Sequence, residues 1–377
     1  VVFKFFASYQ EAIATLNENL IDGIAYLPRE FKDNIVSLSS LRLHRLITPQ
    51  VAILFFNLRK KNSPLGQKEV RQALASAVDR QQIIQNILEK EARPIYGPIL
   101  PEFVPFSAST TRTFNLQQAQ QLLSKAGWKK LNIGESDKEM FARLAEAEEE
   151  ELTEINPQKD EQAFIKQKYW QTLKDFGQGD WLYRLITDDQ SSKKNKDNEQ
   201  NKEIKAEFLQ LEISALDKDE SLRIVGLIKK AWEQLGVKVK LNIVAANQIL
   251  EEVIKPRQFE VLLYNQVLGG DPDVYPFWHS SQIKEGLNIA GFADKETDEL
   301  LEDARLILNK EKRLDKYQRI QEIFYEEQPA IFLYSPFYIY VQANKIKNFS
   351  LQYLYRPQDR FNNITQWYTN TGKRLVW

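Results

Sequence analysis

Cysteine is absent from this chain of 377 residues. Its absence excludes disulfide bonds, thiolate catalysis and cysteine-ligated zinc, and it leaves the redox compartment open. The sequence also lacks any run of about 18 apolar residues, the length that a membrane-spanning helix needs. Neither sign of charge is in excess, because 51 Lys and Arg stand against 52 Asp and Glu. No net field therefore favours nucleic acid or an anionic membrane, and we expect local groups to select any ligand.

The first ten residues, VVFKFFASYQ, show neither the charged leader nor the small-residue cleavage site of a secretion signal. Residues 1–6 are typical of a strand, and they are followed by an expected helix over 8–20 and a short strand over 22–27. Because the first expected strand begins at residue 1 itself, we expect residue 1 to be the cut end of a longer chain. A signal and further structure would then lie upstream.

Hydrophobic residues make up 43% of the chain, enough for a large core in two or three domains or in one lobed assembly. Strand and helix patterns alternate, which is typical of an α/β fold. A buried strand is expected over 51–60 and a helix over 67–88. Four prolines within 92–106 predict a rigid loop without regular structure, and a short helix is expected over 115–128.

The composition changes between about 132 and 206, where charged residues dominate and apolar anchors are few. We expect an inserted excursion there, with a helix around 164–176 and a disordered flank. Regular patterning then returns, with strands expected over 209–216, 237–244 and 259–266 and helices over 220–236 and 247–254.

The segment NQVLGGDPDVYPFWHSSQ, residues 265–282, follows the last of these strands, where open α/β sheets usually place ligands. Catalysis has little support, since Asp271 and Asp273 would project to opposite sides of an extended chain with only His279 near them. The same three residues lack the spacing of a calcium loop or a zinc motif. We therefore expect no catalytic residue, no metal and no cofactor.

Two interpretations of this segment stay open, and they are compatible. In the structural one, Gly269 and Gly270 permit a sharp turn, the aspartates cap the following helix, and the aromatic rings pack in the core. In the binding one, the loop presents free backbone groups to an extended peptide, while ring faces cover the peptide's side chains.

Six ordered blocks resemble consecutive blocks of the family 5 solute-binding proteins, the peptide receptors of ABC importers. They are VAILFFNLRKKNSPLGQKEVRQALASAVDRQQIIQNIL, ARPIYGPILP, AQQLLSKAGW, IKKAWEQLGVKVKLNIV, FEVLLYNQVLGGDPDVYPFWHSSQ and YQRIQEIFYEEQPAIFLYSPFYIYV. Their order and spacing agree with the family along the whole chain, apart from the insertion.

The resemblance implies an α/β, periplasmic-binding-protein-like (type II) fold of two lobes, incomplete at the N-terminus. Residues 1–50 and 335–377 would form part of lobe I, and 51–334 the second ligand-binding lobe, with the charged insertion at about 132–206. The strands VAILFFNL and AIFLYSPFYIYV would cross between the lobes as a hinge pair.

The resemblance also implies a non-enzymatic substrate-binding component that captures peptides, longer ones included, and delivers them to the transmembrane subunits of an ABC permease. We expect an extracytoplasmic monomer, in the periplasm or on the outer cell surface, anchored through a missing N-terminal segment. Two alternatives remain. One is a receptor for another solute, such as an oligosaccharide or a metal chelate. The other is a peptide hydrolase using Ser280 or Ser281 beside His279.

Dipeptide-binding members carry an aspartate for the ligand's ammonium group where this chain has Leu268. End recognition would then come from elsewhere, and the sequence is closer to the branch with LGxDPD. Asn57 and Tyr96 could each face a ligand or only pack locally. The residues expected to bind ligand are Asn57, Tyr96, Tyr264, Gln266, Leu268, Gly269, Gly270, Asp271 and Trp278.

Overall fold

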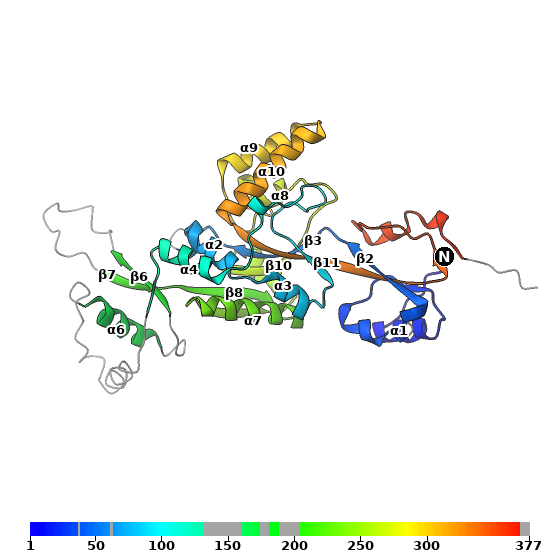
Figure 1. The fold of residues 1–377 in the computed structure, drawn as a ribbon, viewed down its shortest axis with the longest axis horizontal. Coiled ribbons are helices and arrows are strands. Elements are labelled where there is room, and N and C mark those ends of the chain that lie inside the picture. Colours follow the sequence, from blue (N-terminus) through cyan, green and yellow to red (C-terminus); the bar gives the residue numbers. More distant parts are fainter. Residues whose placement is uncertain (37, 61–62, 132–159, 174–180, 188–203, 370–377) are drawn as a thin grey trace, which may run out of the picture.

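The computed structural model describes residues 1–36, 38–60, 63–131, 160–173, 181–187 and 204–369. Within this part of the chain the main feature is a mixed eight-stranded sheet in the order β1-β11-β3-β10-β8-β9, with β2 and β4 added along β11 (Figure 1). Its strands are β1 (Gly23–Ile24), β2 (Leu41–Ile47), β3 (Gln50–Phe56), β4 (Ala92–Pro94), β8 (Gln210–Leu216), β9 (Lys238–Val244), β10 (Val261–Val267) and β11 (Ala330–Ala343).

Strand β3 is buried on both faces, as its continuous apolar run predicts. Val51, Ile53 and Phe55 belong to one apolar cluster, and the alternate residues Ala52 and Leu54 belong to a second one across the sheet. Strand β3 pairs antiparallel with β10 on one side and with β11 on the other. Strand β3 therefore lies between two apolar layers, one on each face of the sheet, and contacts both.

Helices cover both faces of this sheet (Figure 1). One cluster joins β3 to α2, α4 and α7, and the other joins β3 to α8, α9 and α10. None of the helices in the described residues combines the length and apolar character that crossing a membrane requires. The helices are α1 (Tyr9–Asn17), α2 (Lys68–Ser76), α3 (Arg80–Gln82), α4 (Leu116–Lys125), α6 (Glu161–Leu173), α7 (Asp219–Gln234), α8 (Tyr275–Trp278), α9 (Lys295–Leu306) and α10 (Lys310–Glu327).

The single helix expected over 67–88 is broken. Helix α2 ends at Ser76, and the side chain of Asp79 accepts the backbone N–H of Gln82 at 3.0 Å, so that α3 begins a new element. A π-helical turn over Ile83–Ile87 follows. An aspartate that caps a helix competes with continuing the previous one, which the periodicity alone does not reveal.

Two other expectations for the first hundred residues are wrong. Residues 1–6 form no strand and are mostly exposed, because nothing in the described chain pairs with them. The proline-rich stretch does contain a short strand, β4, which pairs with β11 through Tyr334–Pro336. Pro94 is tolerated there because β4 lies at an edge and can do without one donor.

The charged region carries more regular structure than its composition predicted. Helix α6 overlaps the expected helix, and a three-stranded sheet forms from β5 (Lys129–Lys130), β6 (Leu182–Thr187) and β7 (Ile204–Phe208). The helix packs through Phe164 and Ile165 against Leu131, Trp181 and Tyr183. This unit lies at the end of the molecule opposite α1 (Figure 1). The remaining residues of the region, including the expected disordered flank, lie outside the described chain.

The N-terminal and C-terminal segments are joined through β11. After pairing with β3, this strand continues and pairs with β2 from Phe337 to Ala343. Ile339 and Val341 on β11 share a small core with α1 and β1. A short antiparallel pair, β12 (Ile346–Lys347) and β13 (Tyr368–Thr369), completes the C-terminal part.

Glu91 ties these segments to the main sheet. Its side chain is only 2% exposed, and its carboxylate accepts hydrogen bonds from Arg45 on β2 at 2.6 and 2.8 Å and from Lys32 at 2.5 Å. Its own carbonyl accepts the N–H of Phe337 at 3.0 Å, where β11 passes from β3 to β2. A second pair nearby joins Arg29 to Glu220 at 2.9 Å, on the first turn of α7. The N-terminal segment is therefore held beside β11 and α7 by matched charges.

Replacing Glu91 by glutamine leaves Arg45 and Lys32 without their shared carboxylate. We expect the free energy of unfolding at pH 7 to fall by about 1 to 2 kcal/mol, because charge-assisted hydrogen bonds to a buried carboxylate are lost while Arg45 and Lys32 stay partly solvated. Urea denaturation measures this loss. Glu89→Gln is the matched control, because Glu89 is exposed two residues away, and it should change stability by less than about 0.5 kcal/mol.

The stability difference between wild type and Glu91→Gln should depend on pH. Burial raises the pKa of Glu91, but the hydrogen bonds and charges of Arg45 and Lys32 outweigh burial and lower the pKa overall. A carboxyl group whose pKa is lower in the folded state stabilises the fold above its ordinary pKa, about 4.3, and loses that effect as the pH falls through the lowered value. The gap between wild type and Glu91→Gln should therefore narrow below about pH 4. A gap that stays constant down to pH 3 would contradict this account.

Candidate functional site

The second half of β10 has a strand on one side only. Strand β3 pairs with β10 along its whole length, from Val261 opposite Phe56 to Val267 opposite Gln50. Strand β8 runs parallel on the other side but pairs only at Val261 and Leu262. Among the described strands, none pairs with the far side of 263–267 beyond that point. An unpaired strand side presents backbone donors and acceptors in a row.

The hydrogen bonds that flank this ladder show which residues face the open side. The N–H of Asn57 donates to the carbonyl of Glu260 at 2.9 Å, and the N–H of Leu268 donates to Pro49 at 2.6 Å. In this antiparallel register the even-numbered residues of β10 therefore turn their backbone groups toward β3. Asn265 and Val267 consequently turn theirs to the open side.

The side chains of this strand end are unevenly exposed. Tyr264 is half-buried and packs against the cluster that contains Trp278. Asn265 is exposed, and Val267 is 66% exposed. Gln266 is half-buried, and its amide nitrogen has no hydrogen-bond partner among the described residues. The strand therefore ends with Asn265 and Val267 accessible, whereas the unpaired amide nitrogen of Gln266 is buried.

The two glycines that follow differ in what requires them. Neither has a backbone φ in the left-handed region, so conformation alone does not demand glycine. A Cβ at Gly270 would lie 3.2 Å from Cδ1 of Tyr355, whereas a Cβ at Gly269 would meet nothing closer than the N–H nitrogen of Asp271 at 3.7 Å. The ring of Tyr355 leaves little room for a side chain at position 270, which explains the glycine there. Gly269 leaves open space beside the free strand edge.

The two aspartates build the loop. Asp271 accepts the N–H of Asp273 at 2.9 Å, and Asp273 accepts the N–H of Tyr275, the first residue of α8, at 3.0 Å. Asp273 also binds Arg305 at 2.9 Å, whose guanidinium lies 4.0 Å from the ring centre of Tyr275. Of the two expected helix caps, only Asp273 reaches an N–H of α8, and the N-cap residue itself is Val274; Asp271 bonds within the loop. The contact of Asp273 with Arg305 holds the loop against α9.

Two of the predicted ligand residues, Leu268 and Trp278, lie behind this loop. Leu268 is 7% exposed and lies in the same apolar cluster as Trp278. Trp278 is 1% exposed and packs against the rings of Phe55, Phe324 and Phe332. Their burial places Leu268 and Trp278 where they support the loop from the core side.

Both polar atoms of the Asn57 side chain form hydrogen bonds within the protein. Its amide nitrogen donates to the carbonyls of Arg257 and Phe259 at 3.0 and 2.8 Å, and its oxygen accepts the N–H of Arg59 at 3.2 Å. Tyr96 lies on the loop after β4, between the guanidinium of Arg80 and the ring of Phe106. The structure does not bring either residue together with the end of β10.

The hydrolase alternative does place three side chains in contact. Nδ1 of His279 lies 2.8 Å from Oγ of Ser281, and Nε2 lies 3.2 Å from Glu302. However, the backbone N–H of Ser281 also donates to Nδ1 at 3.1 Å, so two donors compete for one lone pair. This geometry is that of a side chain capping a short turn. No group of three or more His, Cys, Asp or Glu residues in the described chain is arranged to hold a metal ion.

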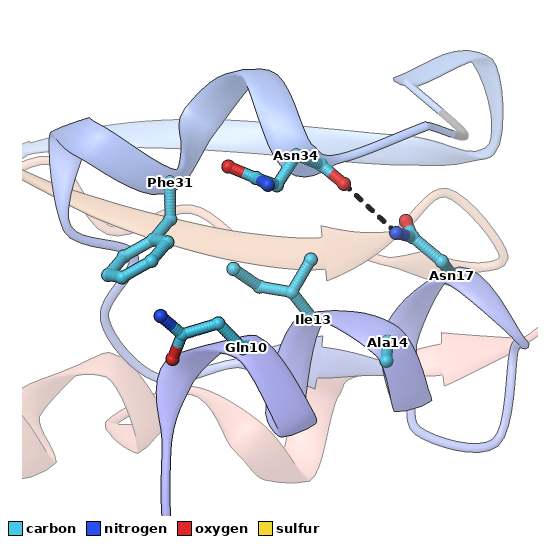
Figure 2. A pocket seen from close by; sticks show the side chains of 6 residues that line it. All are labelled: Gln10, Ile13, Ala14, Asn17, Phe31 and Asn34. Atoms are coloured by element: carbon cyan, nitrogen blue, oxygen red, sulfur yellow. Dashed lines mark hydrogen bonds between the residues drawn. The ribbon is translucent and has the colours of Figure 1, made fainter.

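A separate hollow of about 190 Å³ lies in the N-terminal part (Figure 2). Its lining carries no charged side chain, and the amide of Asn17 already donates to the carbonyl of Asn34 at 3.0 Å. The lining residues are Gln10, Ile13, Ala14, Asn17, Phe31 and Asn34. It belongs to the contact between α1 and the following 3-10 turn and lies apart from the end of β10 (Figure 1).

Sequence reasoning missed Asn265, Val267 and Tyr355. The first two lie in the quoted segment, but their role depends on which residues of β10 bond to β3. Tyr355 touches Gly270 from a segment far along the chain. No sequence signal indicated that contact.

Comparison with known proteins shows what this chain resembles. The model of bacterial extracellular solute-binding proteins, family 5 (middle), matches residues 1–177. Oligopeptide-binding protein AppA of Bacillus subtilis is 24% identical over 323 residues, covering 84% of this chain and 47% of that protein. These matches confirm the resemblance to family 5 solute-binding proteins. The chain spans about half the length of the curated relatives that it matches.

Solved structures show the same fold. The structure of AppA from Bacillus subtilis with a nonapeptide has a TM-score of 0.62 at 21% identity, covering 96% of this chain and 58% of that one. NikZ from Campylobacter jejuni with Ni(L-His) has a TM-score of 0.61 at 20% identity, covering 97% and 60%. The fold is therefore that of the type II periplasmic binding proteins, as the sequence predicted.

Removing the side chain of Asn57 tests its structural role. Asn57→Ala leaves two carbonyls and one N–H unsatisfied in a buried place, so we expect the free energy of unfolding to fall by about 2 kcal/mol. Asn265→Ala, at an exposed position on the same ladder, should change it by less than about 0.5 kcal/mol. Urea denaturation of both variants measures this difference, and equal stability would show that the buried hydrogen bonds of Asn57 contribute nothing.

Proposed function

We propose that this chain is the peptide-holding part of a substrate-binding component of an ABC importer. An extended peptide would add as a strand to the open side of 263–267, bonding the outward backbone groups of Asn265 and Val267. The observation that supports this most is that pairing with β8 ends at Leu262, which leaves one side of 263–267 without a strand among the described residues, and that two exposed glycines stand just after the end of β10. Strand addition uses main-chain hydrogen bonds, which any peptide sequence can supply.

The contents of the site favour a peptide over other solutes. A row of N–H and C=O groups at strand spacing matches another peptide backbone, whereas a sugar presents hydroxyl groups without that period. The structure of NikZ was solved with Ni(L-His), so this fold also accepts a metal chelate. The described residues of this chain contain no metal-binding cluster of their own, and the end of β10 carries backbone groups.

Within this proposal the predicted residues divide into two groups. Tyr264, Gln266, Gly269 and Gly270 would line the site directly, and Asp271 would shape its turn. Asn57, Leu268 and Trp278 would hold that wall from behind, and Tyr96 would line a more distant part of the cleft. Because Leu268 is buried, its position offers no anchor for an ammonium group. We therefore expect binding that depends little on the peptide's charged end.

The wider role follows from the family. Residues 1–50 and 335–377 would belong to lobe I and 51–334 to the second lobe, with β3 and β11 as the crossing strands. The protein would act outside the cytoplasm as a monomer, deliver its ligand to the permease subunits and catalyse no reaction. The description of the family model as extracellular solute-binding proteins supports this placement.

Alanine at Gly269 should separate binding from folding. Its Cβ meets open space in the free protein, so we expect the melting temperature to change by less than about 2 °C. The same methyl group would intrude on a backbone lying along β10, so the Kd for capped nonapeptides should rise by about 10-fold or more. Calorimetry of the full chain measures both quantities.

Gly226→Ala is the matched control, because its Cβ on α7 also meets open space but lies on a helix. It should leave binding unchanged and raise stability by about 0.5 kcal/mol. Wild-type protein that binds nickel–histidine or an oligosaccharide but no nonapeptide would overturn the proposal. Unchanged peptide affinity in Gly269→Ala would place the ligand elsewhere.

A further inference from the structure

The ring of Tyr355 lies at the end of β10 although it comes from the C-terminal segment. Cδ1, Cγ and Cε1 of this ring lie 3.2, 3.3 and 3.5 Å from the point where a Cβ of Gly270 would stand. The side chain is nevertheless 41% exposed, so only part of the ring is used by this contact. The ring of Tyr355 therefore stands partly exposed beside the glycine turn that follows β10.

The backbone holds this ring in place. Leu354 donates its N–H to the carbonyl of Ile47 at 2.8 Å, and the N–H groups of Tyr355 and Arg356 donate to Oδ2 of Asp359 at 3.1 and 2.8 Å. The turn after Ile47 reaches Pro49, whose carbonyl accepts the N–H of Leu268. Tyr355 and the glycine turn are thus fixed to the two ends of one short connection between β2 and β3.

The hydroxyl group of Tyr355 has no hydrogen-bond partner among the described residues. Burial raises the pKa of Tyr355, and the nearby carboxylate of Glu102 adds to the rise, so the phenol stays protonated. Both oxygens of Glu102 accept hydrogen bonds from Arg93, at 2.9 and 2.7 Å. The charge of Glu102 is thus already balanced by Arg93. Tyr355 contributes a neutral hydrogen-bond donor and a ring face to the site.

We propose that Tyr355 is a specificity-determining residue of the peptide site, which it closes on the side of Gly270. This inference rests on the proposed binding of a peptide along β10. The ring covers the peptide backbone and limits the size of the side chain that fits beside Gly270, and its hydroxyl group donates to a peptide carbonyl. The ligand class is an internal, uncharged peptide segment with small side chains at that point.

Two pools of capped nonapeptides test this inference with the full chain. One pool contains only Gly, Ala and Ser, and the other carries Phe, Tyr or Trp at its three central positions. Wild-type protein should prefer the small pool. Tyr355→Ala should weaken binding of the small pool by about 5-fold, because an aromatic contact is lost, and should reduce the preference for small side chains by a similar factor.

Tyr355→Phe keeps the ring and removes the donor. It should weaken binding of both pools by about 3-fold and leave the preference unchanged. Tyr368→Ala is the control, since Tyr368 is a 57% exposed ring of the same C-terminal segment, on β13, and it should alter neither quantity. Circular dichroism checks folding, and Tyr355→Leu replaces the alanine variant if that variant does not fold.

The outcomes distinguish this inference from the proposed function. If wild-type protein binds neither pool, the peptide-binding function itself fails, and the role of Tyr355 fails with it. If wild-type protein binds and the Tyr355 variants show the same affinity and the same preference, only the role of Tyr355 is overturned. A change of preference in Tyr368→Ala as large as that in Tyr355→Ala would also overturn it.

Discussion

The antiparallel ladder between β3 and β10 is the constraint on which the site depends. From Val51 to Phe56 every side chain of β3 is 3% exposed or less, with alternate residues in two separate apolar clusters. A slip by one residue would exchange the two faces, so burial fixes the register strongly. That register makes the backbone groups of Asn265 and Val267 point away from β3. Apolar packing inside the sheet thus decides which polar groups are free at its end.

The open side of β10 is a feature that most proteins avoid. An exposed strand edge invites pairing with other chains, and natural sheets usually cover or shorten such edges. Here β8 leaves β10 after Leu262, and no strand of the described residues covers the far side of 263–267, although β10 lies in the interior of the strand order. A retained free edge at this place is explained if a ligand is the strand that completes it.

Charged groups in this protein mainly hold segments together. Glu91 joins Arg45 and Lys32 beside β11, and Asp273 joins Arg305 to the glycine loop. Once matched in this way, these carboxylates stabilise the walls and contribute less to ligand recognition. Recognition would then fall to backbone groups and neutral side chains. Such a site would accept peptides of many sequences and discriminate mainly by side-chain size.

The sequence by itself determined the elements that have strong periodicity and burial. The patterns of β3, β8, β9, β10 and α7 were readable because each strand or helix places its apolar residues at its own period. Ordered blocks of residues also indicated the resemblance to family 5 solute-binding proteins, and the paired glycines marked the loop. The break at Asp79 and the strands β6 and β7 were missed, because capping and pairing depend on partners that periodicity does not contain.

Only the tertiary structure decided how the candidate site is built. Trp278 and Asp271 had the right residue types for binding, but packing placed the first in the core and made the second part of a turn. Asn265 and Val267 gained their importance from strand pairing, and Tyr355 from a contact with Gly270 across the chain. The physical reason is that residue type and spacing set local conformation, whereas exposure and free hydrogen-bonding capacity depend on which distant segments pack alongside.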